Sequence, residues 1–121
     1  MRIDFPGYVS QQDKIKILQE SDIYLCTSLQ EGFGISVCEA MACELPIVSF
    51  NVPGVRDVVA HECGFLVTLG DIDQMVTKVK VLIQNESLRK EMGQHARQRV
   101  LNHFTWQRAA DRMFEVYCNV Q

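Results

Sequence analysis

Two glutamates, Glu31 and Glu39, flank a short segment in which Gly32 and Gly34 surround Phe33. The N-terminus of a helix presents unpaired N–H groups and a partial positive charge, which suit a phosphate. Carboxylates accept hydrogen bonds from the vicinal hydroxyls of sugars, and glycines let a ligand approach the backbone closely. If a helix begins just after Gly34, these residues predict a site for a ligand that carries phosphate and sugar groups.

Each glutamate also has an ordinary structural interpretation. Glu39 could be a first-turn residue favoured by the helix dipole, and Glu31 could be a solvated loop residue. The glycines do not complete the dinucleotide-binding fingerprint, because Val37 stands where its third glycine would be. The chemistry of this segment therefore depends on where the neighbouring elements place it.

Those neighbours predict strands that alternate with helices. The apolar run 23–26 is typical of a buried parallel strand, and a helix is expected over residues 35–43. In open α/β sheets, ligands bind beyond the carboxyl ends of the strands, which is where residues 27–34 would lie. Further strands are expected at residues 1–5, 47–50 and 64–67. Further helices are expected at residues 10–21, 71–84 and 87–103 and from Thr105 to the C-terminus, and residues 55–60 are expected to form a short helix or an extended link. The core positions of helix 35–43 and its exit are expected to be Cys38, Met41, Ala42 and Leu45.

This alternation predicts the α/β class, as a Rossmann-like three-layer α/β/α fold with a small parallel sheet. The 121 residues suffice for one domain with its own core. About four strands are few for such a sheet, and the chain begins at a predicted strand. We therefore expect residues 1–121 to be a single domain that is truncated at its N-terminal side. An uncovered sheet edge would follow, and with it self-association.

Composition and charge narrow the kinds of partner. The formal net charge of -3 argues against nucleic acid, and the apolar runs are too short to span a membrane. The five cysteines show no metal-ligand spacing, which indicates reduced thiols in a cytoplasmic protein, with Cys26, Cys38 and Cys63 buried. Basic residues gather after residue 73, and we interpret them as solvated helix faces, with peripheral contact to the inner face of a membrane as the alternative. They include Arg89, Lys90, Arg97, Arg99, Arg108 and Arg112.

Several ordered segments resemble one family. Glu31 to Glu39 resembles the Glu-x7-Glu motif of retaining glycosyltransferases with two Rossmann-like domains, the GT-B architecture of the group 1 family. The segments that match its pattern in order are Asp22-Ile23-Tyr24-Leu25 with Thr27-Ser28, Glu31-Gly32-Phe33-Gly34, Glu39-Ala40-Met41-Ala42, Pro46-Ile47-Val48, Gly54 with Asp57, Gly64-Phe65-Leu66-Val67, Gly70-Asp71 and Phe104-Thr105-Trp106. The resemblance covers nearly the whole chain, as the C-terminal donor-binding domain of such an enzyme.

The resemblance implies a role for each residue of the segment. Glu39 would bind the ribose hydroxyls of a nucleotide sugar, and Ile35 and Ser36 would offer N–H groups to its diphosphate. Gly32, Phe33 and Gly34 would offer backbone groups to the sugar. Glu31 would contact the transferred hexose as the catalytic residue, although not as a nucleophile, because the leaving phosphate assists the acceptor. The resemblance implies no cofactor and no metal beyond the donor substrate.

The sequence departs from the family pattern at two positions and lacks parts of the enzyme. Glu44 stands where the family usually has Gly, and Asp57 where it usually has Glu. Neither the family's upstream basic pair for the diphosphate nor its N-terminal acceptor domain is visible. Lys14, Lys16 and Arg56 are the nearest basic residues by topology, and we interpret them as surface residues. The isolated chain is therefore expected to bind donor weakly or not at all and to transfer no sugar.

Other functions remain open at this point. A sugar-nucleotide epimerase or a phosphorylase of the same architecture would be expected to lack the Gly-Phe-Gly context. A non-catalytic interaction or regulatory module could keep the fold without the chemistry. A domain resembling a response regulator would need an acidic cluster and an active lysine, which are not apparent in the sequence.

Overall fold

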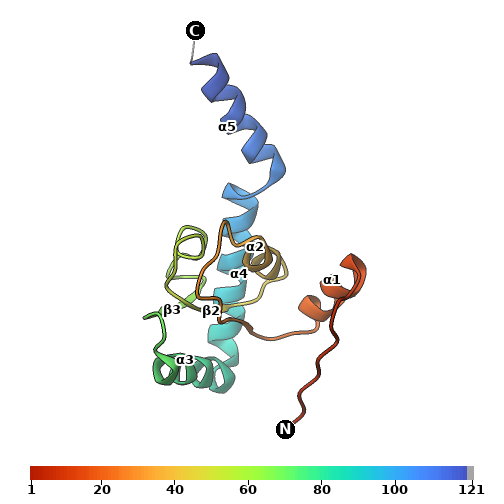
Figure 1. The fold of residues 1–121 in the computed structure, drawn as a ribbon, viewed down its shortest axis with the longest axis vertical. Coiled ribbons are helices and arrows are strands. Elements are labelled where there is room, and N and C mark those ends of the chain that lie inside the picture. Colours follow the sequence, from red (N-terminus) through yellow and green to blue (C-terminus); the bar gives the residue numbers. More distant parts are fainter. Residues whose placement is uncertain (120–121) are drawn as a thin grey trace.

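A computed structural model describes residues 1–119, and it places three parallel strands beside a set of helices (Figure 1). The strands are β1 (Tyr24–Cys26), β2 (Ile47–Phe50) and β3 (Gly64–Val67). Their order in the sheet is β1-β2-β3, and both pairs are parallel. The predicted α/β class and the parallel sheet are confirmed, with one strand fewer than expected.

The strand predicted at residues 1–5 does not form, and that prediction was wrong. The segment runs as an extended tail, with Met1 and Phe5 almost fully exposed (Figure 1). A strand is stable only when a neighbouring strand takes up its hydrogen bonds. Within residues 1–119 this segment has no such neighbour, and alternation of apolar residues alone does not hold it in the sheet.

Four of the five helices described begin at a capping side chain. The helices are α1 (Gln11–Gln19), α2 (Ile35–Ala42), α3 (Ile72–Gln84), α4 (Glu86–His103) and α5 (Trp106–Cys118). Ser10, Asp71, Asn85 and Thr105 each accept a hydrogen bond from a backbone N–H in the first turn of α1, α3, α4 and α5. The exception is α2, whose N-cap is Gly34. The predicted helices are thus confirmed to within two residues at most ends, apart from any part of α5 beyond residue 119.

The core lies around β2, whose four residues are all buried. In α2 the fully buried residues are Val37, Ala40 and Met41, spaced so that they share one helix face. Of the predicted core positions, Met41 and Leu45 are confirmed, whereas Cys38 and Ala42 are only half-buried. The buried face of α2 therefore differs from the predicted one by a shift of about one residue.

Residues 51–63 connect β2 to β3 by consecutive turns instead of the short helix or extended link that was expected. Val52, Val55, Val58 and Val59 of this segment, which we call the turn segment, are buried. Backbone hydrogen bonds from Arg56 to Val52 and from Val59 to Val55 hold it in shape. The segment contributes to the core although it is neither strand nor helix.

The end of α2 packs tightly against α4. Glu44 has φ 62, the left-handed conformation that glycine adopts most easily. A Cβ on Gly93 of α4 would lie 2.8 Å from the Glu44 carbonyl carbon and closer still to its oxygen. Arg97 of α4 donates to the Ala42 carbonyl over 2.6 Å, which places a cation at the C-terminal end of the α2 dipole.

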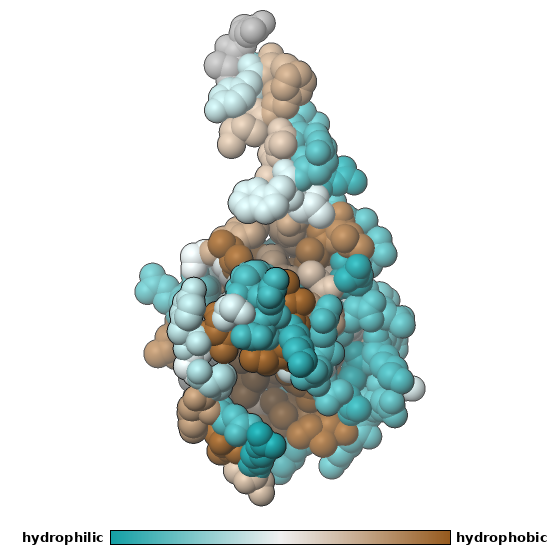
Figure 2. Space-filling model, turned by 90° about the vertical axis from the view of Figure 1, so that its right-hand side faces the viewer, coloured by the Kyte–Doolittle hydropathy of each residue, from teal (hydrophilic) through white to brown (hydrophobic). Residues whose placement is uncertain are grey.

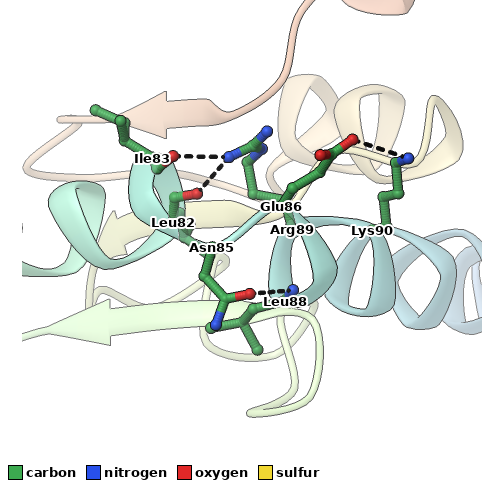
Figure 3. A network of polar contacts seen from close by, with 7 residues as sticks. All are labelled: Leu82, Ile83, Asn85, Glu86, Leu88, Arg89 and Lys90. Carbon is green, nitrogen blue, oxygen red and sulfur yellow. Dashed lines mark hydrogen bonds and ion pairs between the residues drawn. The ribbon is translucent and has the colours of Figure 1, made fainter.

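Arg97, Arg99 and Arg89 are more than the solvated basic residues that the sequence indicated. Arg89 donates to the Leu82 and Ile83 carbonyls over 2.7 and 2.9 Å, and so joins the end of α3 to the start of α4 (Figure 3). Arg99 donates to carbonyls of the turn segment. These arginines satisfy backbone groups that a helix end or a turn leaves unpaired.

Two helices expose apolar side chains. No residue of α5 is buried, and α5 projects away from the sheet (Figure 1). In α1 only Leu18 is buried, while Ile15 and Ile17 remain 40% and 45% exposed. Hydrophobic surface is visible on the side where α1 lies (Figure 2). Among the helices described, none has the length and apolar character needed to cross a membrane.

Candidate functional site

Residues 27–34, here called the donor loop, leave the carboxyl end of β1 and lead into α2. Within the loop, the Ser28 hydroxyl donates to Glu31 Oε1 over 2.9 Å. Glu31 is half-buried, so this contact fixes one carboxylate oxygen and leaves lone pairs on the other for a ligand. The predicted strand–loop–helix placement of Glu31 is observed.

The N-terminus of α2 carries backbone donors without a capping side chain. Gly34 is its N-cap, with φ 78, and no side chain accepts from the first turn. The N–H groups of Ile35 and Ser36 precede the first intrahelical bond, which Cys38 makes to the Gly34 carbonyl over 3.0 Å. Both residues are exposed. An anion placed here would meet free N–H groups and the positive end of the helix dipole.

Glu39 follows one turn into α2 and is held by a second helix. Lys14 Nζ of α1 lies 2.8 Å from Glu39 Oε2, and both side chains are partly exposed. Lys14, which was interpreted as a surface residue, is partly exposed and pairs with Glu39. Sequence reasoning missed this pair because it joins two helices, and helical spacing predicts partners only within one helix.

The turn segment lies against the backbone of the donor loop at Gly54. This glycine has φ 88, and a Cβ built on it would lie 2.7 Å from the Glu31 carbonyl oxygen and nearer still to that of Gly32. The Gly54 carbonyl oxygen in turn lies 3.5 Å from the position that a Cβ on Gly34 would take. Gly54 was visible in the sequence only as a turn residue, and its contact with the loop depends on the fold.

Phe33 is 56% exposed, and its ring meets that of Phe104 in an edge-to-face arrangement. Asp57, the shorter substitute for Glu, uses its backbone carbonyl to accept from Arg99. That contact does not depend on the length of the Asp57 side chain. The structure thus brings the α4–α5 junction to the donor loop, which the sequence did not indicate.

The donor loop is open to solvent. Two surface hollows lie elsewhere, one between the end of α4 and α5, and the other beside residues 43–45 and the start of α4. Neither is lined by Glu31 or Glu39.

The thiols near the loop are poor nucleophiles. Burial raises the pKa of Cys38, and the Glu39 carboxylate raises it further. Burial also raises the pKa of Cys43. Both thiols therefore stay protonated at neutral pH. Among residues 1–119, no group of three His, Cys, Asp or Glu side chains is placed to hold a metal ion.

Residues 1–99 match the family of glycosyl transferases group 1. The capsular polysaccharide biosynthesis glycosyltransferase CapM of Staphylococcus aureus is 38% identical over 78% of this chain, which spans 25% of that relative. Sucrose-phosphate synthase of Thermosynechococcus elongatus superposes with a TM-score of 0.89 at 25% identity, over 98% of this chain and 30% of its own. A TarM variant from S. aureus, solved with UDP, superposes with a TM-score of 0.79 at 28% identity, over 94% of this chain and 22% of its own.

Replacing Gly54 by Ala should displace the donor loop. Gly70 is the matched control, because it has φ 84 but a Cβ there would meet no atom within 4 Å. Both substitutions incur the cost of a left-handed residue, while only Gly54→Ala adds a clash. We expect Gly54→Ala to lose about 1–3 kcal/mol more unfolding free energy than Gly70→Ala in urea titrations. Equal losses would contradict the close approach.

Proposed function

The chain belongs to the group 1 glycosyl transferases, and we propose that its donor loop and α2 bind a nucleoside diphosphate sugar. Glu39 binds the ribose hydroxyls, and the N–H groups of Ile35 and Ser36 bind the diphosphate. Glu31 contacts the transferred hexose, together with the backbone of residues 32–34. The observation that carries the proposal is the uncapped N-terminus of α2, with a fixed carboxylate before it and another after it.

This arrangement suits departure of a nucleoside diphosphate. Negative charge grows on the phosphate oxygen as the bond to the sugar breaks, and helix N–H groups aimed at that oxygen stabilise it. Glu31 accepts hydrogen bonds from sugar hydroxyls while Ser28 fixes its orientation. It orients the sugar and forms no bond to it, and the leaving phosphate assists the attacking acceptor. No divalent metal is needed for these roles.

Lys14 supplies a positive charge beside Glu39. Its ammonium group fixes one Glu39 oxygen and leaves the other for the ribose. It also places a cation at the donor site, where a diphosphate carries negative charge. We assign Lys14 to the donor site as a positioning residue for Glu39.

We further propose that the whole enzyme transfers a hexose with retention of configuration. The chain spans 25% and 30% of two curated relatives, so an N-terminal domain would supply the acceptor site and the second wall of the donor cleft.

Five free cysteines suit the reducing cytoplasm. Contact with the inner face of a membrane is a weaker proposal, because Asp111 and Glu115 offset Arg108 and Arg112 on α5.

Substituting the two glutamates separates their roles. Glu39→Gln should weaken binding of the nucleotide and of the nucleotide sugar alike, because both contain the ribose. Glu31→Gln should weaken only the nucleotide sugar, since the free nucleotide lacks the hexose. Each loss should be about tenfold, as for a charge-assisted hydrogen bond. Ligand-detected NMR with UDP, GDP and ADP and their sugars measures both affinities, with Glu91→Gln on α4 as the control.

Unchanged affinities in both variants would favour a non-catalytic module that kept the fold. Affinities are expected to be low, because half of the cleft belongs to the N-terminal domain. For the same reason, incubation of the 121-residue chain with sugar nucleotides and an acceptor extract should give no transfer. Robust transfer by this chain alone would contradict the proposal that a separate N-terminal domain supplies the acceptor site.

We also propose that the chain self-associates through the free edge of β1. Leu25 on this strand is 50% exposed. Leu25→Lys should reduce the association seen by light scattering, because a charge on an edge strand opposes pairing. Leu69→Lys, at a leucine of 51% exposure in a distant turn, should leave it unchanged. A clean monomer at high concentration would refute the proposal.

A further inference from the structure

Phe104 marks the junction between α4 and α5, in the segment Phe104-Thr105-Trp106, to which the proposed donor site assigns no role. Phe104 is half-buried and packs against the core, whereas Trp106 is 91% exposed. The two aromatic residues of this segment therefore face different surroundings. Only Phe104 is turned toward the body of the domain.

The ring of Phe104 lies close to the Arg99 guanidinium and to the Phe33 ring, besides the ring of its chain neighbour His103. The Arg99 guanidinium carbon lies 5.4 Å from its centroid, within the range of a cation–π interaction. The Phe33 ring lies 6.0 Å away at an interplanar angle of 72°, which is the edge-to-face arrangement that aromatic pairs prefer. Phe104 thus connects α4 to the donor loop.

Arg99 is itself fixed by the turn segment. Its Nε donates to the Val58 carbonyl over 2.6 Å, and its Nη2 to the Asp57 carbonyl over 3.3 Å. The same segment contains Gly54, which lies against the backbone of the donor loop. The loop is therefore contacted on its backbone at residues 31 and 32 and on its side chain at Phe33.

The Phe33 contact matters because glycines stand on both sides of it. Gly32 has no atom within 4 Å of an added Cβ, and Gly34 is in the left-handed conformation. Glycine populates many backbone conformations. A side-chain anchor on Phe33 restricts the whole Gly-Phe-Gly segment, whose backbone groups are those proposed to face the sugar.

We infer that Phe104 is a positioning residue that holds Phe33 and so fixes residues 32–34 in a conformation ready for the sugar of the donor. Arg99 sets the position of Phe104, and the start of α5 is thereby coupled to the donor loop. This inference deepens the proposed function, on which the identity of the ligand depends. The geometry of the coupling does not depend on that identity.

The test uses the full 121-residue chain with Phe104→Leu, which keeps an apolar side chain, and Phe104→Ala. Trp106→Ala is the matched control two residues away. NMR relaxation and amide shifts of residues 32–34, with the ring resonances of Phe33, report the loop. Urea unfolding follows global stability separately. Both Phe104 variants should increase loop mobility and move the Phe33 ring signals toward solvent-exposed values, while Trp106→Ala should change neither.

Phe104→Leu decides the question even if Phe104→Ala fails to fold. Changes in residues 32–34 no larger than those of Trp106→Ala would overturn the inference. In the donor titrations, Phe104→Leu should weaken the nucleotide sugar about twofold to tenfold and leave the free nucleotide unchanged, as expected from the contribution of an aromatic pair. Donor binding that Glu31→Gln and Glu39→Gln leave unchanged would count against the proposed function, whereas the loop measurement would still decide the role of Phe104.

Discussion

The packing of α2 on α4 is the contact on which the rest of this domain depends. At Gly93 the backbone of α4 comes so close to the Glu44 carbonyl that a side chain has no room. This contact orients α2, whose first turn carries the proposed phosphate donors and whose second turn carries Glu39. The same α4 helix supplies Arg97 and leads through Arg99 to Phe104. The α4 helix therefore supports α2 through Gly93 and Arg97, and it supports the donor loop through Arg99 and Phe104.

The donor loop is a flexible sequence held in one conformation by its surroundings. Two glycines allow its backbone to reach a ligand, and the same freedom would leave an isolated loop disordered. The turn segment contacts the loop at Gly54, and Phe104 contacts Phe33. Ser28 fixes Glu31 from within the loop. Preorganisation of this kind reduces the conformational entropy that the loop loses when a ligand binds.

Much of this architecture was predictable because the signals are local. The apolar runs at 47–50 and 64–67 and the capping residues Ser10, Asp71 and Thr105 were sufficient to place most strands and helices. The family followed from ordered motifs. The prediction of a first strand failed because alternation of apolar residues does not ensure pairing, and residues 1–5 run as an exposed tail that pairs with no described strand.

The contacts that define the site were not predictable from the sequence. Lys14 reaches Glu39 only after α1 packs beside α2. The bond from Arg99 to the Val58 carbonyl joins residues far apart in the chain. Propensity and periodicity describe one element at a time, so side-chain to backbone bonds between elements are visible only in three dimensions. These contacts determine where the residues of the motif lie on the surface of the domain.

The central claim is that the N-terminus of α2 receives the diphosphate of a nucleotide. Amide chemical-shift mapping on the isotope-labelled chain, during addition of UDP, GDP and ADP, tests it most directly. The account predicts that the largest changes fall on Ile35, Ser36 and Glu39 for whichever nucleotide binds. Changes concentrated at the hollow between α4 and α5, around Arg108 and Arg112, would contradict it.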